Sequence, residues 1–356
     1  MTKPIRVVIV DDSALMRQIL SETLSRETGI EVVGQARDPY EAREIIKATH
    51  PDVVTLDVEM PRMDGLAFLE KIMTLRPMPV VMVSTLTQEG SEATIRALEL
   101  GAVDYVPKPC AAPHGDILEI LRQDLVEKVK MAAHARVTAR PPAGTPAPPT
   151  LPPPRRGSST GQFIAIGAST GGVERIRDIL TVLPGACPPI VIAQHMGPSY
   201  LASFASRLDK LAAPTVQLAT HGARLKVGTV YIAPGERHLA VARDVAGYFC
   251  QLQDTPLVSG HKPSVDVLFH SVAKAAGGNV VGVILSGMGR DGAAGLAAMR
   301  AAGAHTIGES EGSCVVYGMP RAAKEAGGVA VEMPLSHIPA EMLRAIEAIS
   351  DRPRQA

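Results

Sequence analysis

The chain has 356 residues, which is long enough for two domains with proper hydrophobic cores. Its 36 basic and 36 acidic residues cancel, so no basic field indicates binding to nucleic acid or to an anionic membrane. The four cysteines form no C-x-x-C pair, which argues against a zinc knuckle or a disulfide framework and suits a reducing, cytoplasmic location.

The first 130 residues alternate short apolar runs with segments of helical periodicity. Short connections between such segments are typical of a doubly wound parallel sheet, so we expect a flavodoxin-like (βα)5 domain. The expected strands are 5–10, 30–35, 53–57, 79–84 and 103–106, and the expected helices are 13–25, 39–49, 66–75, 91–100 and 116–130.

No targeting or membrane segment is expected. The first apolar run, residues 5–10, is interrupted by Asp11 and Asp12, which a signal peptide would not tolerate at this point. No apolar stretch approaches the roughly 20 residues that a membrane-spanning helix needs, so we expect no membrane insertion.

Polar residues follow the ends of the expected strands in this first domain. They are Asp11, Asp12, Asp57, Ser84 and Lys108. Because the carboxyl ends of parallel strands share one edge, these side chains are predicted to converge in one crevice. Three clustered carboxylates repel one another unless a cation lies among them, and oxygen ligands without His or Cys favour Mg²⁺. A lysine and a hydroxyl beside them suit a phosphoryl oxygen.

In this combination, residues 1–125 resemble a response-regulator receiver domain of a two-component system. The resemblance implies that Asp57 accepts a phosphoryl group from a histidine kinase, with Mg²⁺ held by the three aspartates. It also implies that Ser84 and Lys108 contact the phosphoryl group. Tyr105 matches the switch aromatic of that family.

Residues 126–160 are expected to be a linker. Eight of the chain's 29 prolines lie between positions 137 and 160, where neither a helix nor a sheet ladder can form. A proline-recognition ligand is the alternative, but a semi-rigid spacer is the simpler interpretation. A second domain is therefore predicted over residues 161–350.

The second domain opens with an apolar strand, 163–166, a glycine turn, and a helix over 173–180. The turn fits the G-x-S-x-G form of a nucleophile elbow, which would expose the Ser169 hydroxyl at the sheet edge beside a helix N-terminus. The same residues form a degenerate G-x-G-x-x-G, the pattern of a dinucleotide-binding site. Such a site needs an acidic residue at the end of the next strand, but here that strand ends in Gln194 and His195, which disfavours it. A plain strand–helix turn is the third interpretation.

Two further strand ends supply partners for Ser169. His195 follows the strand 189–193, so it is predicted to lie beside Ser169. A glycine-rich turn after the strand 279–285 contains Asp291, which could orient the imidazole, and Asp266 competes for that role. We prefer Asp291, because it leaves a central strand, and predict a triad in the order Ser, His, Asp.

The remaining predictions complete an α/β domain that is doubly wound and mostly parallel. Residues 238–241 and 248–252 read as an antiparallel hairpin, which we expect to belong to the main sheet. The other expected elements are helices over 201–211 and 267–276 and a strand and turn over 229–235.

Residues 161–350 resemble the catalytic domain of the chemotaxis protein-glutamate methylesterases, the CheB family. The segments that carry the resemblance are 166–172, 192–196, 231–235, 261–269, 287–292 and 313–320.

The resemblance implies a serine hydrolase that removes γ-methyl esters from chemoreceptor glutamates and deamidates glutamines, with no cofactor for this step. It places the oxyanion hole at the turn around Thr170 and at the segment of Met288. The implied phosphodonor is a kinase of the CheA type, and the receiver is expected to restrain the esterase until Asp57 is phosphorylated. The alternative is a response regulator whose output domain only binds proteins, or one that acts outside chemotaxis.

Overall fold

The structure is a computed structural model that describes residues 3–60, 64–85, 87–108, 116–137, 150–152 and 161–351, without the side chains of 116–121. The chain divides into two compact units, residues 1–145 and 146–356. Most of the predicted linker, 126–160, lies outside the described residues, and the predicted domain limits stay a prediction.

The first unit contains a five-stranded parallel sheet in the order β2-β1-β3-β4-β5, as the flavodoxin-like prediction required. Helices α1 and α5 pack against each other, as do α3 and α4. The strands are β1 (Ile5–Val10), β2 (Ile30–Ala36), β3 (Val53–Asp57), β4 (Val80–Ser84) and β5 (Asp104–Pro107). The helices are α1 (Ala14–Ser25), α2 (Pro39–Thr49), α3 (Gly65–Leu75), α4 (Gln88–Glu99) and α5 (Asp116–Ala132).

Side-chain caps determine where the helices of this unit begin. Ser13 accepts a hydrogen bond from the Met16 amide at 3.3 Å and so caps the first helix. Asp38, Asp64 and Thr87 cap the next three helices in the same way. Each cap satisfies amide groups that have no partner inside the helix, so each βα connection has a fixed start.

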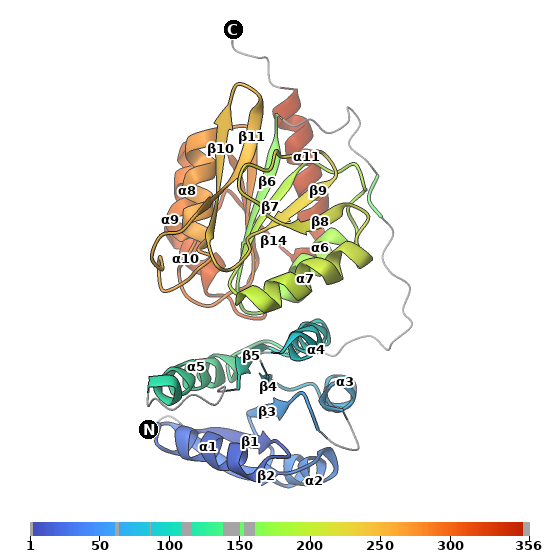
Figure 1. Ribbon diagram of the computed structural model, residues 1–356, viewed down its shortest axis with the longest axis vertical. Coiled ribbons are helices and arrows are strands. Elements are labelled where there is room, and N and C mark those ends of the chain that lie inside the picture. The colour runs from blue at the N-terminus through green and yellow to red at the C-terminus, as the bar shows by residue number, and fades with distance from the viewer. Residues whose placement is uncertain are drawn as a thin grey trace. The chain divides into compact units, whose positions relative to one another are not determined.

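The second unit contains a seven-stranded sheet in the order β14-β13-β12-β6-β7-β9-β8, and every neighbouring pair in it is parallel. Figure 1 shows α8, α9 and α10 on one side of this sheet and α6, α7 and α11 on the other. The strands are β6 (Phe163–Ala168), β7 (Ile190–Gln194), β8 (Thr215–Leu218), β9 (Thr229–Ile232), β12 (Val280–Ile284), β13 (His305–Glu309) and β14 (Val331–Met333). The helices are α6 (Gly172–Leu180), α7 (Pro198–Leu211), α8 (Val265–Ala276), α9 (Ala293–Ala301), α10 (Met319–Glu325) and α11 (Ile338–Ser350), with a short 3₁₀ turn, η1 (Leu335–His337).

The predicted hairpin forms, but it does not join the main sheet. Strands β10 (His238–Asp244) and β11 (Gly247–Gln253) pair only with each other, as an antiparallel two-stranded sheet. Strand β10 packs instead against α8, where the Val241 amide donates to Ser271 Oγ at 2.9 Å. The expectation that the main sheet carries an antiparallel piece is therefore wrong.

Strand β6 lies at the centre of the main sheet, between β7 and β12. Its six residues are buried, and core side chains from β6, α8 and the hairpin, among them Phe163, Tyr248 and Phe269, pack together. Three neighbouring strands therefore end at one edge, and the polar segments after β6, β7 and β12 meet there. Within the part of the chain that the structure describes, no helix is long and apolar enough to cross a membrane.

Candidate active site and phosphorylation site

The turn after β6 holds Ser169 in a tight strand–helix connection. Gly171 has φ +76°, and a Cβ there would lie 2.7 Å from the Val315 side chain, so only glycine fits this position without strain. The Ser169 carbonyl accepts hydrogen bonds from the Gly172 amide at 2.8 Å and from Gln194 Nε2 at 2.9 Å. These contacts hold the serine at the start of α6, as the elbow pattern predicted.

His195 follows β7 and lies next to the Ser169 turn. Ala168 pairs with Gln194 in the register of β6 and β7, and the His195 amide donates to the Ala168 carbonyl at 3.1 Å. His195 Nε2 lies 2.7 Å from Asp291 Oδ2, and the two side chains are 6% and 1% exposed. His195 Nδ1 is buried and has no hydrogen-bond partner among the described residues. The ring therefore offers Nδ1 to a further group.

Asp291 is held by the start of helix α8 as well as by His195. Its carboxylate accepts hydrogen bonds from the Val265 amide at 2.7 Å, the Asp266 amide at 3.1 Å and Ser264 Oγ at 2.8 Å. Burial by itself would raise the pKa of Asp291, but the hydrogen bonds from His195 and from α8 outweigh it, and the pKa is lowered. Asp291 is thus kept ionised and can fix the Nε2–H tautomer of His195.

Asp266, the competing candidate, faces another way. Its Oδ1 accepts a hydrogen bond from the Gly295 amide at 2.7 Å, at the first turn of α9. Burial raises the pKa of Asp266, which is the opposite of the shift at Asp291. The structure therefore joins Asp291, and not Asp266, to the imidazole.

A second histidine covers the face of the His195 ring. The rings of His195 and His261 stack with centroids 3.8 Å apart and planes inclined by 14°. Burial lowers the pKa of His261 to about 4, and the neighbouring His195 adds to this effect, so His261 is neutral near pH 7. An uncharged ring next to His195 would not oppose the positive charge that His195 would take up if it acted as a base.

The segments of Thr170 and Met288, the predicted oxyanion-hole residues, are joined through Ser286. Ser286 Oγ donates to the Thr170 carbonyl at 2.8 Å, and the Ser169 amide donates to the Ser286 carbonyl at 3.1 Å. Thr170 is buried and Met288 is half-buried. A Cβ on Gly287, which precedes Met288, would lie 2.8 Å from Ser169 Cβ, so the two loops are in close contact.

The loops after β6 and β12 are also held by a buried charged pair, Glu309 and Arg175. Glu309, at the end of β13, is fully buried and accepts a hydrogen bond from the Ser286 amide at 2.9 Å. Arg175 Nε lies 3.6 Å from Glu309, and Arg175 Nη2 donates to the Ser313 carbonyl at 2.8 Å. Burial raises the pKa of Glu309, and Arg175 works against that rise. The pair joins helix α6 to the segments after β12 and β13.

In the first unit, the predicted polar residues converge at the ends of β1, β3 and β5. Lys108 Nζ lies 3.0 Å from Asp11 Oδ2 and 2.8 Å from Asp57 Oδ2. Carboxylate oxygens of Asp11, Asp12 and Asp57 lie within 4.8 Å of one another. Asp11 and Asp57 are buried and Asp12 is exposed, so the group is open to solvent on one side.

The electrostatics of this group favour a bound cation. Burial raises the pKa of Asp57 to about 6; Lys108 opposes this rise and Asp11 adds to it. Burial also raises the pKa of Asp11 against the effect of Lys108. One lysine therefore does not compensate the buried carboxylates fully. A divalent ion with oxygen ligands fits this donor set.

Ser84 and Tyr105 lie in the same unit, on β4 and β5. Ser84 is fully buried, and its Oγ donates to the Gly90 carbonyl at 3.1 Å, at the start of α4. Tyr105 is 8% exposed, and the Lys128 ammonium lies 4.9 Å from the centre of its ring. The Ser84 carbonyl accepts a hydrogen bond from the Lys108 amide at 2.7 Å, so Ser84 lies at the same sheet edge as the acidic cluster.

Comparisons with known proteins agree with this two-part organisation. Residues 164–342 match the CheB methylesterase family profile, and residues 7–121 match the response regulator receiver domain profile. A Rhizobium etli protein named protein-glutamate methylesterase/protein-glutamine glutaminase is 55% identical over 346 residues, 97% of either chain. A Caulobacter vibrioides protein with the same name, numbered 1, is 58% identical over 335 residues, 93% of this chain and 95% of that one.

A solved structure supports the fold of the second unit. The catalytic domain of Thermotoga maritima CheB methylesterase aligns with a TM-score of 0.51 and 35% identity, covering 52% of this chain and 98% of that domain. The fold and the matches define a response regulator with a receiver domain and a methylesterase output domain that has a mostly parallel α/β fold. The chain belongs to the CheB methylesterase family.

Several residues of the site were not singled out from the sequence. They are polar side chains that end a strand or lie in the loop after a strand or before a helix, a property that many surface residues share. They are Gln194, His261, Ser264, Ser286 and Glu309.

Proposed function

We propose that this chain hydrolyses γ-methyl esters of glutamate side chains on chemoreceptors and deamidates glutamine side chains at the same site. Relatives that are 55% and 58% identical carry the name of this double activity. The observation that carries the proposal is the buried His195–Asp291 pair, at 2.7 Å, beside the Ser169 elbow. A proposal of a binding module alone is not favoured, because binding needs no such pair.

In this reaction Ser169 Oγ attacks the ester carbonyl while His195 takes the serine proton. Because Nε2 faces Asp291, the accepting atom is His195 Nδ1. His195 then returns the proton to the leaving methoxide, and methanol departs. Water attacks the resulting acyl-enzyme with His195 again as the base, which restores Ser169 and frees the glutamate carboxylate. A glutamine substrate follows the same course with ammonia as the leaving group.

The oxyanion of the tetrahedral intermediate would lie between the Thr170 turn and the Met288 segment. Helix α6 begins at Gly172, so its positive dipole end is directed at this region. Ser286 would keep the two segments at a constant separation, since it bonds to the Ser169–Thr170 turn on one side and precedes Met288 on the other. Fixed donors of this kind stabilise developing negative charge without reorganisation.

We propose that Asp57 is the phospho-acceptor of the receiver and that Asp11, Asp12 and Asp57 hold Mg²⁺. Support comes from the clustered oxygens and from the receiver profile that matches residues 7–121. The ion would neutralise charge on the incoming phosphoryl group. Lys108, within 3.0 Å of two of the carboxylates, would pair with a phosphoryl oxygen.

The proposed phosphodonor is a histidine kinase of the CheA type, and the proposed location is the cytoplasm. A receiver domain implies a phosphodonor, and the name of the relatives implies a protein substrate with modified glutamates. Cys187, Cys250 and Cys314 are buried free thiols, which suits a reducing compartment. Ser84 and Tyr105 would be the residues that respond to phosphorylation.

The test is the Ser169→Ala variant. It should lower methyl ester hydrolysis and deamidation of receptor peptides by about 10⁴–10⁶-fold, because the nucleophile is lost. Mass spectrometry of esterified and glutamine-containing receptor peptides measures both products. A serine-reactive fluorophosphonate should label the wild type and spare the variant.

The matched control is Ser350→Ala, a hydroxyl at the end of α11 that bonds to Gln162 Oε1 and lies outside the proposed site. It should keep fluorophosphonate labelling at Ser169. Substantial ester hydrolysis by a pure, folded Ser169→Ala sample would contradict the proposal.

A further inference from the structure

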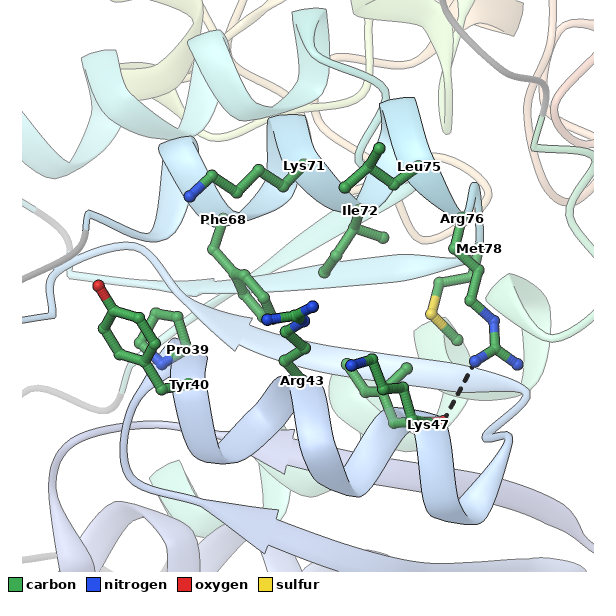
Figure 2. A pocket seen from close by; sticks show the side chains of 11 residues that line it. Pro39, Tyr40, Arg43, Lys47, Phe68, Lys71, Ile72, Leu75, Arg76 and Met78 are labelled. Carbon is green, nitrogen blue, oxygen red and sulfur yellow. Dashed lines mark hydrogen bonds between the residues drawn. The ribbon is translucent and has the colours of Figure 1, made fainter.

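Helices α2 and α3 of the first unit enclose a groove that neither the proposed catalysis nor the proposed phosphorylation uses. Its volume is about 500 Å³, within the range of ligand and peptide sites in proteins. Figure 2 shows side chains of α2 facing side chains of α3 across it. The residues that line this α2–α3 groove are Pro39, Tyr40, Arg43, Ile46, Lys47, Phe68, Lys71, Ile72, Leu75, Arg76 and Met78.

The floor of the α2–α3 groove is apolar, and its rim carries exposed apolar side chains as well. Ile46, Phe68 and Ile72 are each less than 9% exposed, so they form a dry base. Tyr40 and Leu75, in contrast, are 62% and 81% exposed, and are two of the six large exposed hydrophobic side chains of the described residues. Apolar side chains that gather around one concave surface mark a binding site more often than scattered ones do.

The charged side chains that line the groove are all basic. Arg43, Lys47, Lys71 and Arg76 line it, and no carboxylate does. Glu44 lies 3.3 Å from Lys47 and 4.0 Å from Arg43, but these pairs are exposed and exposed pairs contribute little. The groove therefore combines an apolar base with a cationic rim, which complements a ligand of apolar core and acidic edges.

The spacing of the lining residues favours a helix as the ligand. Phe68, Lys71, Ile72 and Leu75 follow the i, i+3, i+4, i+7 pattern, so a single face of α3 lines the groove over two turns. A helix packs between two helices through such rows of side chains. We propose that the α2–α3 groove binds an acidic, amphipathic α-helix of a partner protein, with its apolar stripe against Phe68 and Ile72.

The test uses the full-length chain and a fluorescein-labelled, side-chain-stapled helical peptide of about 16 residues, roughly 24 Å long. This probe has Leu in an i, i+3, i+4, i+7 stripe flanked by Glu. One control peptide has the same composition in an order that destroys the stripe, and another has Lys in place of Glu. Fluorescence anisotropy should show saturable binding of the probe and no saturation with either control.

Two protein variants locate the site. Leu75→Glu and the double change Arg43→Glu with Lys71→Glu should each weaken binding of the probe by at least about tenfold. The matched control is Leu15→Glu, which introduces the same charge at a 68% exposed leucine of α1, outside the groove, and should leave binding unchanged. Thermal melts show whether each variant is folded, and chemical shifts of Ile72 and Leu75 methyl groups should move on titration with the probe.

Three results would overturn the proposal. The first is a wild type that binds the probe no better than the stripe-destroyed peptide. The second is a folded Leu75→Glu variant that binds as tightly as Leu15→Glu. The third is a single-stranded oligonucleotide that binds more tightly than the probe and loses its binding in Arg43→Glu with Lys71→Glu, which would make the groove a phosphate-backbone site.

Discussion

His195 is held by two different contacts, and its Nδ1 has no hydrogen-bond partner among the described residues. Asp291 contacts the edge of the ring at Nε2, and His261 covers its face. The edge contact determines the tautomer and the face contact determines the plane of the ring. Substitution of Asp291 and substitution of His261 should therefore have different effects on the reaction.

Asp291→Asn should lower ester hydrolysis by roughly 10⁴-fold, because an amide does not hold the Nε2–H tautomer or stabilise the imidazolium. Asp266→Asn is the matched control, since this carboxylate bonds to the Gly295 amide and not to His195. Its activity should stay within a few-fold of wild type. The measurement is kcat for an esterified receptor peptide, and a larger loss in Asp266→Asn would assign the third role to Asp266.

His261→Phe should keep most of kcat, because a neutral ring can still stack on His195. His261 itself is neutral above its pKa of about 4, so removing its nitrogens changes no charge at pH 6 to 8. His261→Lys should lower kcat by tenfold or more, because a cation about 4 Å from the imidazolium repels it.

The pH–rate profile distinguishes the charge effect from misfolding. In His261→Lys the acid limb should move to lower pH, since the added cation disfavours protonation of His195. In His261→Phe the limb should not move above pH 5. Equal loss of kcat in both variants, with unmoved limbs, would mean that the stack has only a packing role.

At the scale of elements, both units place polar residues after the carboxyl ends of parallel strands. In the first unit the ends of β1, β3 and β5 supply Asp11, Asp57 and Lys108. In the second unit the ends of β6 and β7 supply Ser169 and His195. Parallel strands bring such segments to one edge whatever the sequence between them, so the same topology serves two chemistries.

Asp57 should incorporate phosphate from a small phosphodonor only when Mg²⁺ is present. The ion would offset the repulsion among three carboxylates and the phosphoryl oxygens, which Lys108 alone does not offset. Asp57→Asn should abolish incorporation, and excess chelator should do the same to the wild type. Asp64→Asn is the control, because asparagine keeps the N-cap of α3. Labelling of Asp57→Asn at the wild-type level would place the acceptor elsewhere.

At the scale of the whole molecule, two compact units share one chain. The proline-rich sequence over residues 137–160 ties them together at high effective concentration, so even a weak association between them would persist. Phosphorylation adds about −1.5 to −2 charges beside Lys108, enough to bias a receiver with two states. We therefore expect the receiver to regulate the esterase.

A truncated protein that begins at Gly157 should therefore hydrolyse receptor esters faster than the unphosphorylated full chain. A small phosphodonor should raise the rate of the full chain only, and Asp57→Asn should not respond. Initial rates of methanol release measure all three. Equal rates for the full and truncated proteins, without a response to the donor, would leave the receiver as a targeting domain.

Much of the fold and part of the candidate site could be predicted from local sequence patterns. The alternation of apolar runs and helical segments predicted the five-stranded receiver sheet, and the polar strand ends predicted which residues of the acidic cluster converge. The G-x-S-x-G turn and the following strand end placed Ser169 beside His195. These features could be predicted because they depend on the spacing of residues along the chain and on the edge that parallel strands share.

Tertiary structure alone decided the features that depend on contacts between distant segments. The hairpin β10–β11 packs on α8 instead of joining the main sheet. The sequence could not predict this, because strand periodicity does not show which element a strand packs against. The sequence favoured Asp291 over Asp266, but only the structure shows that the N-terminus of α8 holds Asp291 against His195. The stack of His261 on His195 and the cationic α2–α3 groove likewise arise from side chains that folding brings together across many intervening residues.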